Sequence, residues 1–216
     1  MSTALALPGG GTVSMMWLRM SNESWTSAAA TFLAMWLVMM VAMMLPSLAL
    51  LLVTLRHRGR AALAAAGYFS VWALFGAMVY VLGVAIAAAE LRWPAVAGYA
   101  PLATGVGLLG AGCVQLTPWK AGWLARCRAC AAPASADVAA AFQHGVRFGV
   151  ECTLCCTGLM AVLLLAGMMH LTVVALVAVA IALERLAPRP ERTARAIGIV
   201  VTGLGLFAIV HAAVSR

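Results

Sequence analysis

The chain has 216 residues, of which 65% are hydrophobic and 9% charged, and its mean hydropathy is +1.03. About a quarter of the residues of soluble domains are charged, so this composition excludes an ordinary water-soluble domain and a disordered chain, and it indicates a membrane protein. Six cysteines in 216 residues are also too few for a secreted disulfide scaffold.

Six apolar segments have roughly the 20 residues needed to cross a bilayer. In chain order they are 29–54, 64–88, 97–117, 146–168, 170–187 and 194–214. Only Met169, His170 and Thr172 divide the fourth from the fifth, which therefore form either one bent segment or a tight hairpin. The expected fold class is all-α, a polytopic transmembrane helical bundle of about six spans. Residues 29–216 form its membrane domain, and residues 1–28 form an outer N-terminal segment.

Lys and Arg concentrate in alternate connections between these segments. The connections after the first, third and fifth spans contain Arg56, Arg58 and Arg60, then Lys120, Arg126, Arg128 and Arg147, then Arg185, Arg189, Arg192 and Arg195. Because cytoplasmic loops are rich in Lys and Arg, we expect these connections, including a loop at 118–145, to face the cytoplasm and both termini to face away from it. The expected location is the inner or plasma membrane. The net charge of +8 then needs no nucleic-acid partner.

The densest group of chemically active residues is Cys152, Cys155 and Cys156, near the start of the fourth span. Positions i, i+3 and i+4 lie on one face of a helix, so the three sulfurs should converge and could hold one soft metal ion. The alternative is that Cys serves as a small apolar packing residue. All six Cys fall at mid-membrane or on the predicted cytoplasmic side, which is reducing, and this favours metal ligation or redox exchange over structural disulfides.

Methionines add thioether sulfur to the same region. The first span contains Met35, Met39, Met40, Met43 and Met44, which form i,i+4 pairs, and Met160 lies one turn after Cys156. Each Met taken singly is better explained as packing. As a set with the Cys they predict a series of soft ligands that suits Cu(I), with Zn(II) less well matched. Apart from Glu151, no acidic residue lies clearly inside a predicted span, so hard cations are not expected; Glu151 should pair with Arg147.

Several motifs resemble an integral membrane family described as predicted metal-binding, domain of unknown function 2182. The motifs are Trp36 to Pro46 (WLVMMVAMMLP), GYFSVW from Gly67, QLTPWK from Gln115 to Lys120, Arg126-Cys127-Arg128, the run Gly145 to Cys156, Leu159-Met160, Gly167 with Met169, and Glu184. The resemblance implies a polytopic helical membrane protein with a metal role, for which copper is the candidate ion. The chain departs from the family pattern at Leu154, where Gly is usual, at Thr157, where Trp is usual, and in the extra Cys130.

The leading hypothesis is a Cu(I) transporter or membrane chaperone. Cys152, Cys155 and Cys156 would form the metal site with Met160, and Cys113 would complete it from the third span. Met39 and Met43 would collect or conduct the ion, and Cys127 and Cys130, a C-x-x-C pair, would exchange it with a soluble copper carrier. No Ser, His and acidic residues suggest a hydrolase, so a binding or transport protein is expected rather than an enzyme.

Two alternatives stay open at this point. A membrane thiol-disulfide oxidoreductase would explain the C-x-x-C pair but not the methionines. A non-catalytic subunit or assembly factor of a membrane complex would use the Cys for packing only. The expected partners are the lipid bilayer and either a copper carrier or a membrane complex, and a homo-oligomer is left open.

Overall fold

The computed structural model describes residues 4–6, 12–14, 24–54, 58–129, 138–168 and 170–214. Two short antiparallel strands, β1 (Ala4–Ala6) and β2 (Thr12–Ser14), precede the helices. The helices of the described residues are α1 (Trp25–Thr54), α2 (Arg58–Arg92), α3 (Pro94–Leu116), α4 (Pro118–Ala129), α5 (Val138–Ala166), α6 (Leu171–Leu186) and α7 (Pro190–Val214). The expected helical bundle is therefore what the chain forms, with this small hairpin added.

Five of these helices are long and apolar enough to cross a membrane. Their apolar parts are Trp25–Leu45, Gly59–Arg92, Ala95–Leu116, Ala140–Ala166 and Pro190–Val214. The segment predicted as a fifth span, 170–187, forms α6, whose 16 residues rise about 24 Å, less than the roughly 30 Å of a hydrocarbon core. A count of six complete spans stays a prediction.

α5 and α6 are separate helices, and a glycine makes the break between them. Gly167 adopts a φ of +98°, a left-handed conformation that residues with a Cβ rarely take. Its N–H still donates to the Leu163 carbonyl, and its own carbonyl accepts from the His170 N–H. The chain therefore turns sharply and brings α6 back into contact with α5 and α1. Of the two predictions for residues 146–187, the tight hairpin describes the structure better than one bent helix.

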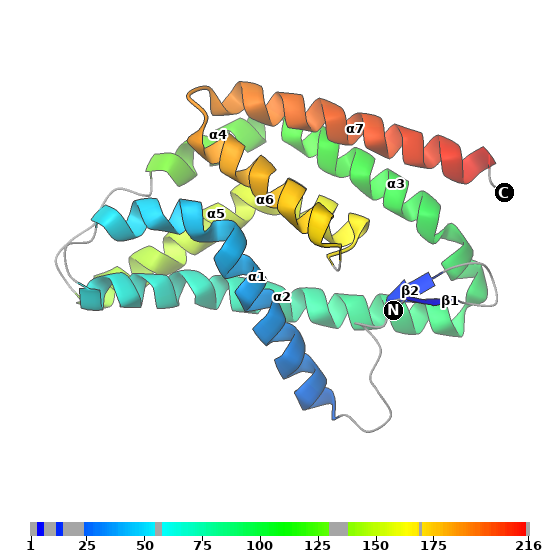
Figure 1. Ribbon diagram of the computed structural model, residues 1–216, viewed down its shortest axis with the longest axis horizontal. Helices are drawn as coiled ribbons and strands as arrows, with labels where there is room; N and C mark the ends of the chain where they lie inside the picture. The colour runs from blue at the N-terminus through cyan, green and yellow to red at the C-terminus, as the bar shows by residue number, and fades with distance from the viewer. Residues whose placement is uncertain are drawn as a thin grey trace.

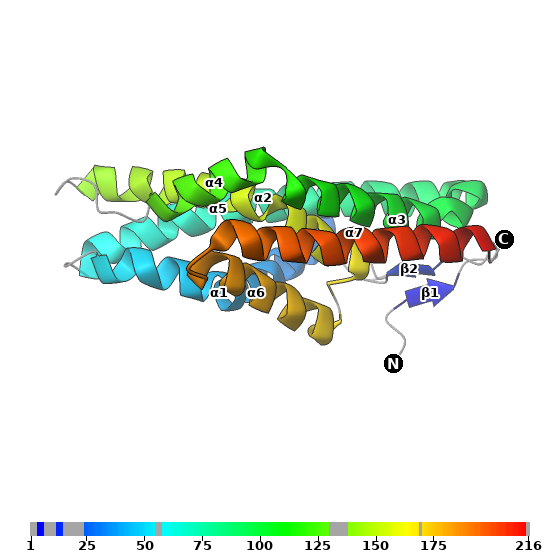
Figure 2. The ribbon, with the colours of Figure 1, turned by 90° about the horizontal axis from the view of Figure 1, so that it is seen from above.

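Two tightly packed helix pairs frame the molecule. Figures 1 and 2 both show α3 beside α7, and α5 runs along α2. Glycines allow these backbones to approach closely: a Cβ at Gly145 would overlap the Ala64 carbonyl of α2, and one at Gly205 would lie 2.5 Å from the Leu109 backbone nitrogen of α3. Small residues at helix contacts are the usual means of close packing in membranes.

α1, α4 and α6 fill and cover the region between the two pairs. α1 bends along its length in Figure 1, as expected for a helix that contains Pro46, because proline removes a hydrogen bond from the helix ladder. The residues predicted as a cytoplasmic loop, 118–145, are largely helical where they are described, since α4 and the first turns of α5 lie within them.

The helix ends that adjoin the basic connections lie at one end of the molecule. In Figure 1 the C-terminal end of α1, the N-terminal ends of α2, α5 and α7, and the whole of α4 lie in the left-hand half of the view. The alternating arrangement inferred from the Lys and Arg positions requires this grouping. Which face of the membrane this end occupies stays a prediction.

Candidate metal centre

α5 is the central helix of the bundle and positions three of the cysteines. Half of the residues in its apolar segment are buried, against 22% to 28% in the other four membrane-length helices. Cys152, Cys155 and Cys156 are at most 1% exposed, so the spacing i, i+3, i+4 does place all three on the buried face. Gly145 and Gly149 lie on this side too, and their lack of a side chain lets α2 approach.

A fourth thiol reaches the same place from α4. Thr117 ends α3 and caps α4, because its hydroxyl oxygen accepts from the Lys120 N–H at 3.3 Å and Pro118 occupies the first helical position, where a missing N–H costs nothing. α4 then packs on α5 and buries Cys127, which is 1% exposed. The sequence predicted Cys127 in a loop, with an exchange role; the structure places it in α4, buried in the same core as the α5 thiols, and the exchange role stays a prediction.

The thiols surround a guanidinium group. Arg185 of α6 donates to the Cys127 sulfur at 2.9 Å through one terminal nitrogen, and to the sulfurs of Cys152 at 2.9 Å and Cys156 at 3.5 Å through the other. Arg185 is only 7% exposed. Its inclusion among the charges of a cytoplasmic loop was therefore wrong, because α6 continues past it to Leu186 and turns this side chain inward.

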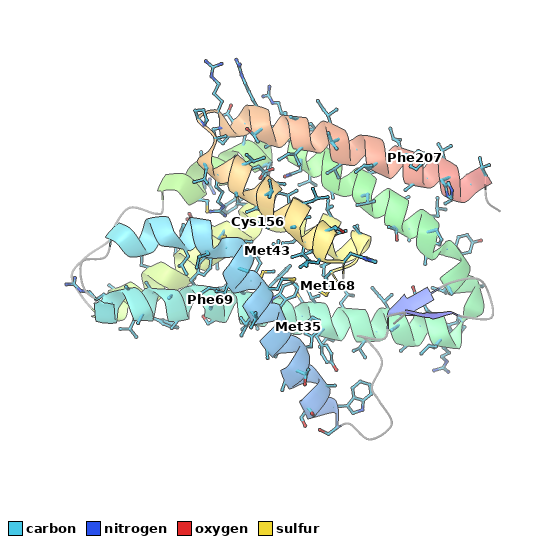
Figure 3. All side chains as sticks on the ribbon, in the orientation of Figure 1. Met35, Met43, Phe69, Cys156, Met168 and Phe207 are labelled. Carbon is cyan, nitrogen blue, oxygen red and sulfur yellow. The ribbon has the colours of Figure 1, made fainter. Side chains whose placement is uncertain are left out.

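Tyr68 and Met44 complete the surroundings of Cys152. The Tyr68 hydroxyl is hydrogen-bonded to the Cys152 sulfur at 3.0 Å, and the Met44 thioether lies 3.9 Å from the same sulfur. Both side chains are fully buried. Met44 thus joins the methionines of α1 to the thiols of α5, and Figure 3 shows Met43 and Cys156 in the same central part of the molecule.

A buried ion pair fastens α4 to the helices around it. The Lys120 ammonium donates to Glu184 of α6 at 2.7 Å and to the Cys155 carbonyl of α5 at 2.5 Å. The other Glu184 oxygen accepts from the Gln115 amide of α3 at 2.6 Å. The sequence did not anticipate a buried carboxylate at Glu184, because the neighbouring Arg185 and the prolines after it suggested a loop at that point. Whether this segment crosses the membrane stays a prediction.

The local charge favours a thiolate at Cys127. Hydrogen bonds from Cys152 and Cys155, together with the positive charge of Arg185, lower the pKa of the Cys127 thiol to about 4 despite its burial. Thiolate is the form of Cys that binds metals and attacks disulfides. The centre therefore brings together four thiols and a thioether beside one buried cation, which favours ionisation of the Cys127 thiol.

The sulfur atoms of this cluster suit a soft metal ion, although they are not arranged as metal ligands in this structure. Among the described residues no three His, Cys, Asp or Glu side chains are arranged to hold a metal ion. Instead, three sulfurs contact the Arg185 nitrogens. A metal would need the sulfurs to draw together to bonds of about 2.3 Å, as in zinc–thiolate sites. Thiolate and thioether ligands suit soft ions such as Cu(I), and thiolates also bind Zn(II).

The remaining predicted ligands divide into those near the cluster and those away from it. Met43 and Met160 are buried in the same core as the four thiols, and the half-buried Met39 packs against that core. Cys113 is exposed on α3 and does not complete the site. Cys130 lies outside the described residues. The predicted ion pair between Arg147 and Glu151 is present, at 3.4 Å.

Sequence reasoning missed the roles of Arg185, Glu184, Tyr68 and Lys120. The signal for two of them was available: Glu184 and Arg185 are adjacent opposite charges at the end of a strongly apolar segment, where a bundle interior is an alternative to a loop. Tyr68, Gln115, Lys120 and Glu184 also belong to the motifs that carried the family resemblance.

Comparison with known proteins gives one family. The model of the PpoB2 copper chaperone family matches residues 33–208, so the chain belongs to this family. The matched segment contains the four buried thiols, Arg185 and the Lys120–Glu184 pair. No curated protein and no solved structure matches the chain. Family membership supports a role in copper handling.

Proposed function

We propose that this member of the copper chaperone family binds Cu(I) within the membrane at Cys127, Cys152, Cys155 and Cys156 and passes it to a partner. The observation that carries the proposal is the convergence of the Cys127, Cys152 and Cys156 sulfurs on one guanidinium, with the Met44 thioether 3.9 Å from Cys152. Soft sulfur donors that are buried and come from three helices fit a Cu(I) site.

The positions of the sulfurs support a path as well as a site. Met35 of α1 is 42% exposed, whereas Met40, Met43 and Met44 are buried beside the thiols. Thioethers bind Cu(I) without adding charge, so they can lead the ion to the thiolates through an apolar region. We assign Met44 the transfer to Cys152. A chaperone would hand the Cu(I) ion directly to a partner, whereas a transporter would carry it across the whole bilayer.

Cys127 is the thiol best placed to release the ion. It lies on α4, outside the membrane-length helices and at the end of the molecule where the basic connections gather. A soluble carrier with exposed thiols could take Cu(I) from Cys127 by ligand exchange after α4 moves. Cys130, three residues along, would assist that exchange. The Lys120–Glu184 pair would keep α4 closed in the absence of the carrier.

Chelator competition on purified protein tests the proposal. The protein in detergent is reduced, loaded with Cu(I) and titrated with a colorimetric Cu(I) chelator to obtain stoichiometry and affinity. We expect about one tightly bound Cu(I) per chain. Replacing Cys152, Cys155 and Cys156 together by Ser should abolish tight binding. Undiminished binding in that variant would overturn the assignment.

Cys113→Ser is the matched control, because it removes one thiol that is exposed and lies outside the cluster. It should bind Cu(I) as the wild type does. Loss of binding in Cys113→Ser and not in the triple variant would move the site to α3. Elution of each variant as a single species from a sizing column would show that the bundle is intact.

A thiol oxidoreductase is the second candidate, and one observation favours it. The Cys127 sulfur shares the Arg185 guanidinium with Cys152 and Cys156, and the positive charge helps to lower the pKa of the Cys127 thiol, as expected for an attacking thiol beside a partner thiol. Thiol trapping under oxidising and reducing conditions distinguishes the two functions. A redox carrier must show a reversible disulfide at Cys127, with Cys152, Cys155 or Cys130. A copper site should show fully alkylatable thiols in both conditions once the metal is removed.

A further inference from the structure

Arg185 is a fixed positive charge inside a site proposed to hold a positively charged ion. A cation in that position repels a metal ion and should weaken metal binding. It does not do so if the negative charge of the thiolate ligands exceeds the positive charge of the metal. The charge of Arg185 therefore bears on which ions the site accepts. This inference rests on the proposed copper site.

The contacts of Arg185 leave sulfur as its counter-charge. Among the described residues the ion pairs are Lys120–Glu184 and Arg147–Glu151, and neither includes Arg185. Both oxygens of the adjacent Glu184 are taken by Lys120 and Gln115. The terminal nitrogens of Arg185 donate to sulfurs, and its buried Nε has no hydrogen-bond partner. The positive charge of Arg185 is thus directed at the thiols, whereas that of Lys120 is balanced by a carboxylate.

The charge of a metal–thiolate complex depends on the charge of the metal. For any given number of thiolates, the complex of a monovalent ion has one more negative charge than that of a divalent ion. With two thiolates the monovalent complex has a charge of −1 and the divalent complex is neutral. A guanidinium in contact with the sulfurs therefore attracts the monovalent complex more strongly, and the difference is large because the site is buried.

We propose that Arg185 is a specificity-determining residue, which makes the thiol site favour a monovalent soft ion such as Cu(I) over divalent thiophilic ions such as Zn(II) and Cd(II). Thiolates alone bind all three ions well. Arg185 does not ligate the metal. It offsets the extra negative charge that a buried Cu(I)–thiolate complex has and a divalent complex with the same thiolates lacks.

The test is the ratio of two affinities in the same purified protein. Cu(I) affinity is measured by chelator competition, and Cd(II) affinity by the ultraviolet absorbance of cadmium–thiolate bonds. Arg185→Gln should lower the Cu(I) affinity roughly ten- to a hundredfold more than the Cd(II) affinity. Arg185→Lys keeps the charge and should restore most of the ratio. A general loss of packing would weaken both ions alike and would not depend on charge.

Glu184→Gln is the opposite test, because it increases the net positive charge near the thiols and leaves Arg185 unchanged. It removes the carboxylate that balances Lys120, so it adds net positive charge beside the Cys155 backbone, and the amide can still accept from Lys120. The Cu(I) to Cd(II) affinity ratio should rise above that of the wild type.

An unchanged Cu(I) to Cd(II) affinity ratio in both Arg185→Gln and Glu184→Gln would overturn the role of Arg185 while leaving the copper site in place. If Arg185→Gln does not fold, the Glu184→Gln result decides: an unchanged or lowered affinity ratio in that variant would overturn the role of Arg185. Failure of the wild type to bind Cu(I) would instead overturn the proposed function, so the two outcomes are distinguishable.

Discussion

The α2/α5 and α3/α7 pairs are packed by the same means but differ in what surrounds them. In both, glycines bring two helix backbones into contact, Gly67 and Gly145 in the first pair and Gly105 and Gly205 in the second. The α2/α5 pair is surrounded by α1, α4 and α6, which contribute Met44, Cys127, Arg185 and Glu184. The outward residues of α7, such as Phe207, are exposed and apolar.

This difference separates what builds a membrane bundle from what makes it functional. Close helix packing is a general requirement and appears in both pairs. Buried charges are costly in an apolar setting, and among the described residues Lys120, Glu184 and Arg185 all lie on α4 and α6, beside the buried thiols. Cys113 illustrates the point, because it is on α3 and exposed, while four other Cys meet beside α5. The following variants test this difference between the α2/α5 pair with its surrounding helices and the rest of the bundle.

The largest effect is expected from Lys120→Met. It leaves the buried Glu184 carboxylate without its ammonium partner, which should destabilise the protein by about 3–5 kcal/mol. Chemical denaturation in detergent measures the loss. Addition of Glu184→Gln to Lys120→Met should recover much of it. Arg147→Ala breaks the ion pair at the surface, where Arg147 is 75% exposed, and should cost less than about 1 kcal/mol. Equal losses in the two single variants would contradict the distinction between the buried and surface pairs.

Glycine substitutions should separate the two helix pairs next. Gly145→Ala and Gly205→Ala both force a methyl group into a backbone contact, so each should destabilise the protein by about 1–3 kcal/mol or more. Only Gly145→Ala should also weaken Cu(I) binding, because α5 carries the thiols. Gly203→Ala, which adds a methyl group in open space, is the control. Weaker Cu(I) binding in Gly205→Ala would show that the site depends on both pairs.

Tyr68→Phe should have a smaller effect. It removes the hydroxyl that is hydrogen-bonded to the Cys152 sulfur at 3.0 Å and leaves the ring packing in place. A loss of about 1 kcal/mol in stability is expected for one buried hydrogen bond, with a change in Cu(I) affinity of no more than about tenfold. Thermal unfolding with and without Cu(I) measures both quantities. Tyr80→Phe, on the same helix, provides the comparison.

The smallest equilibrium effect is expected from Met44→Leu, which replaces the thioether by a side chain of similar volume. We expect stability to change by less than about 1.5 kcal/mol and the rate of Cu(I) uptake to fall several-fold. Stopped-flow transfer from a Cu(I)–chelator complex measures the rate. Met78→Leu alters an exposed methionine of α2 and should leave the rate unchanged. An equal slowing in both variants would exclude a specific path through Met44.

The sequence was sufficient for those features that depend on local periodicity. Apolar runs predicted the membrane helices, and the spacing of Cys152, Cys155 and Cys156 predicted a shared face, because both follow from the geometry of one helix. The fourth thiol, Cys127, depends on how α4 folds back on α5. Arg185 faces the thiols because α6 returns into the bundle after Gly167. Such contacts between segments are not encoded in any single helical pattern.

The methionines show the same limit within one helix. The i,i+4 pattern in α1 predicted Met39 and Met43 equally with Met44, since each belongs to such a pair. Which sulfur reaches Cys152 is decided by the rotation of α1 against its neighbours and by its bend, and the structure selects Met44. Trp36, whose indole N–H donates to the Trp72 carbonyl at 3.0 Å, fixes this rotation from the same helix.

The most direct test of the central claim, that buried sulfur binds copper in this protein, is X-ray absorption at the copper edge of the purified, Cu(I)-loaded chain. The account predicts a first coordination shell made only of sulfur, with a spectrum unchanged in Cys113→Ser and lost in the Cys152/Cys155/Cys156→Ser variant. A shell of nitrogen or oxygen ligands, or a sulfur shell that survives the triple replacement, would contradict it.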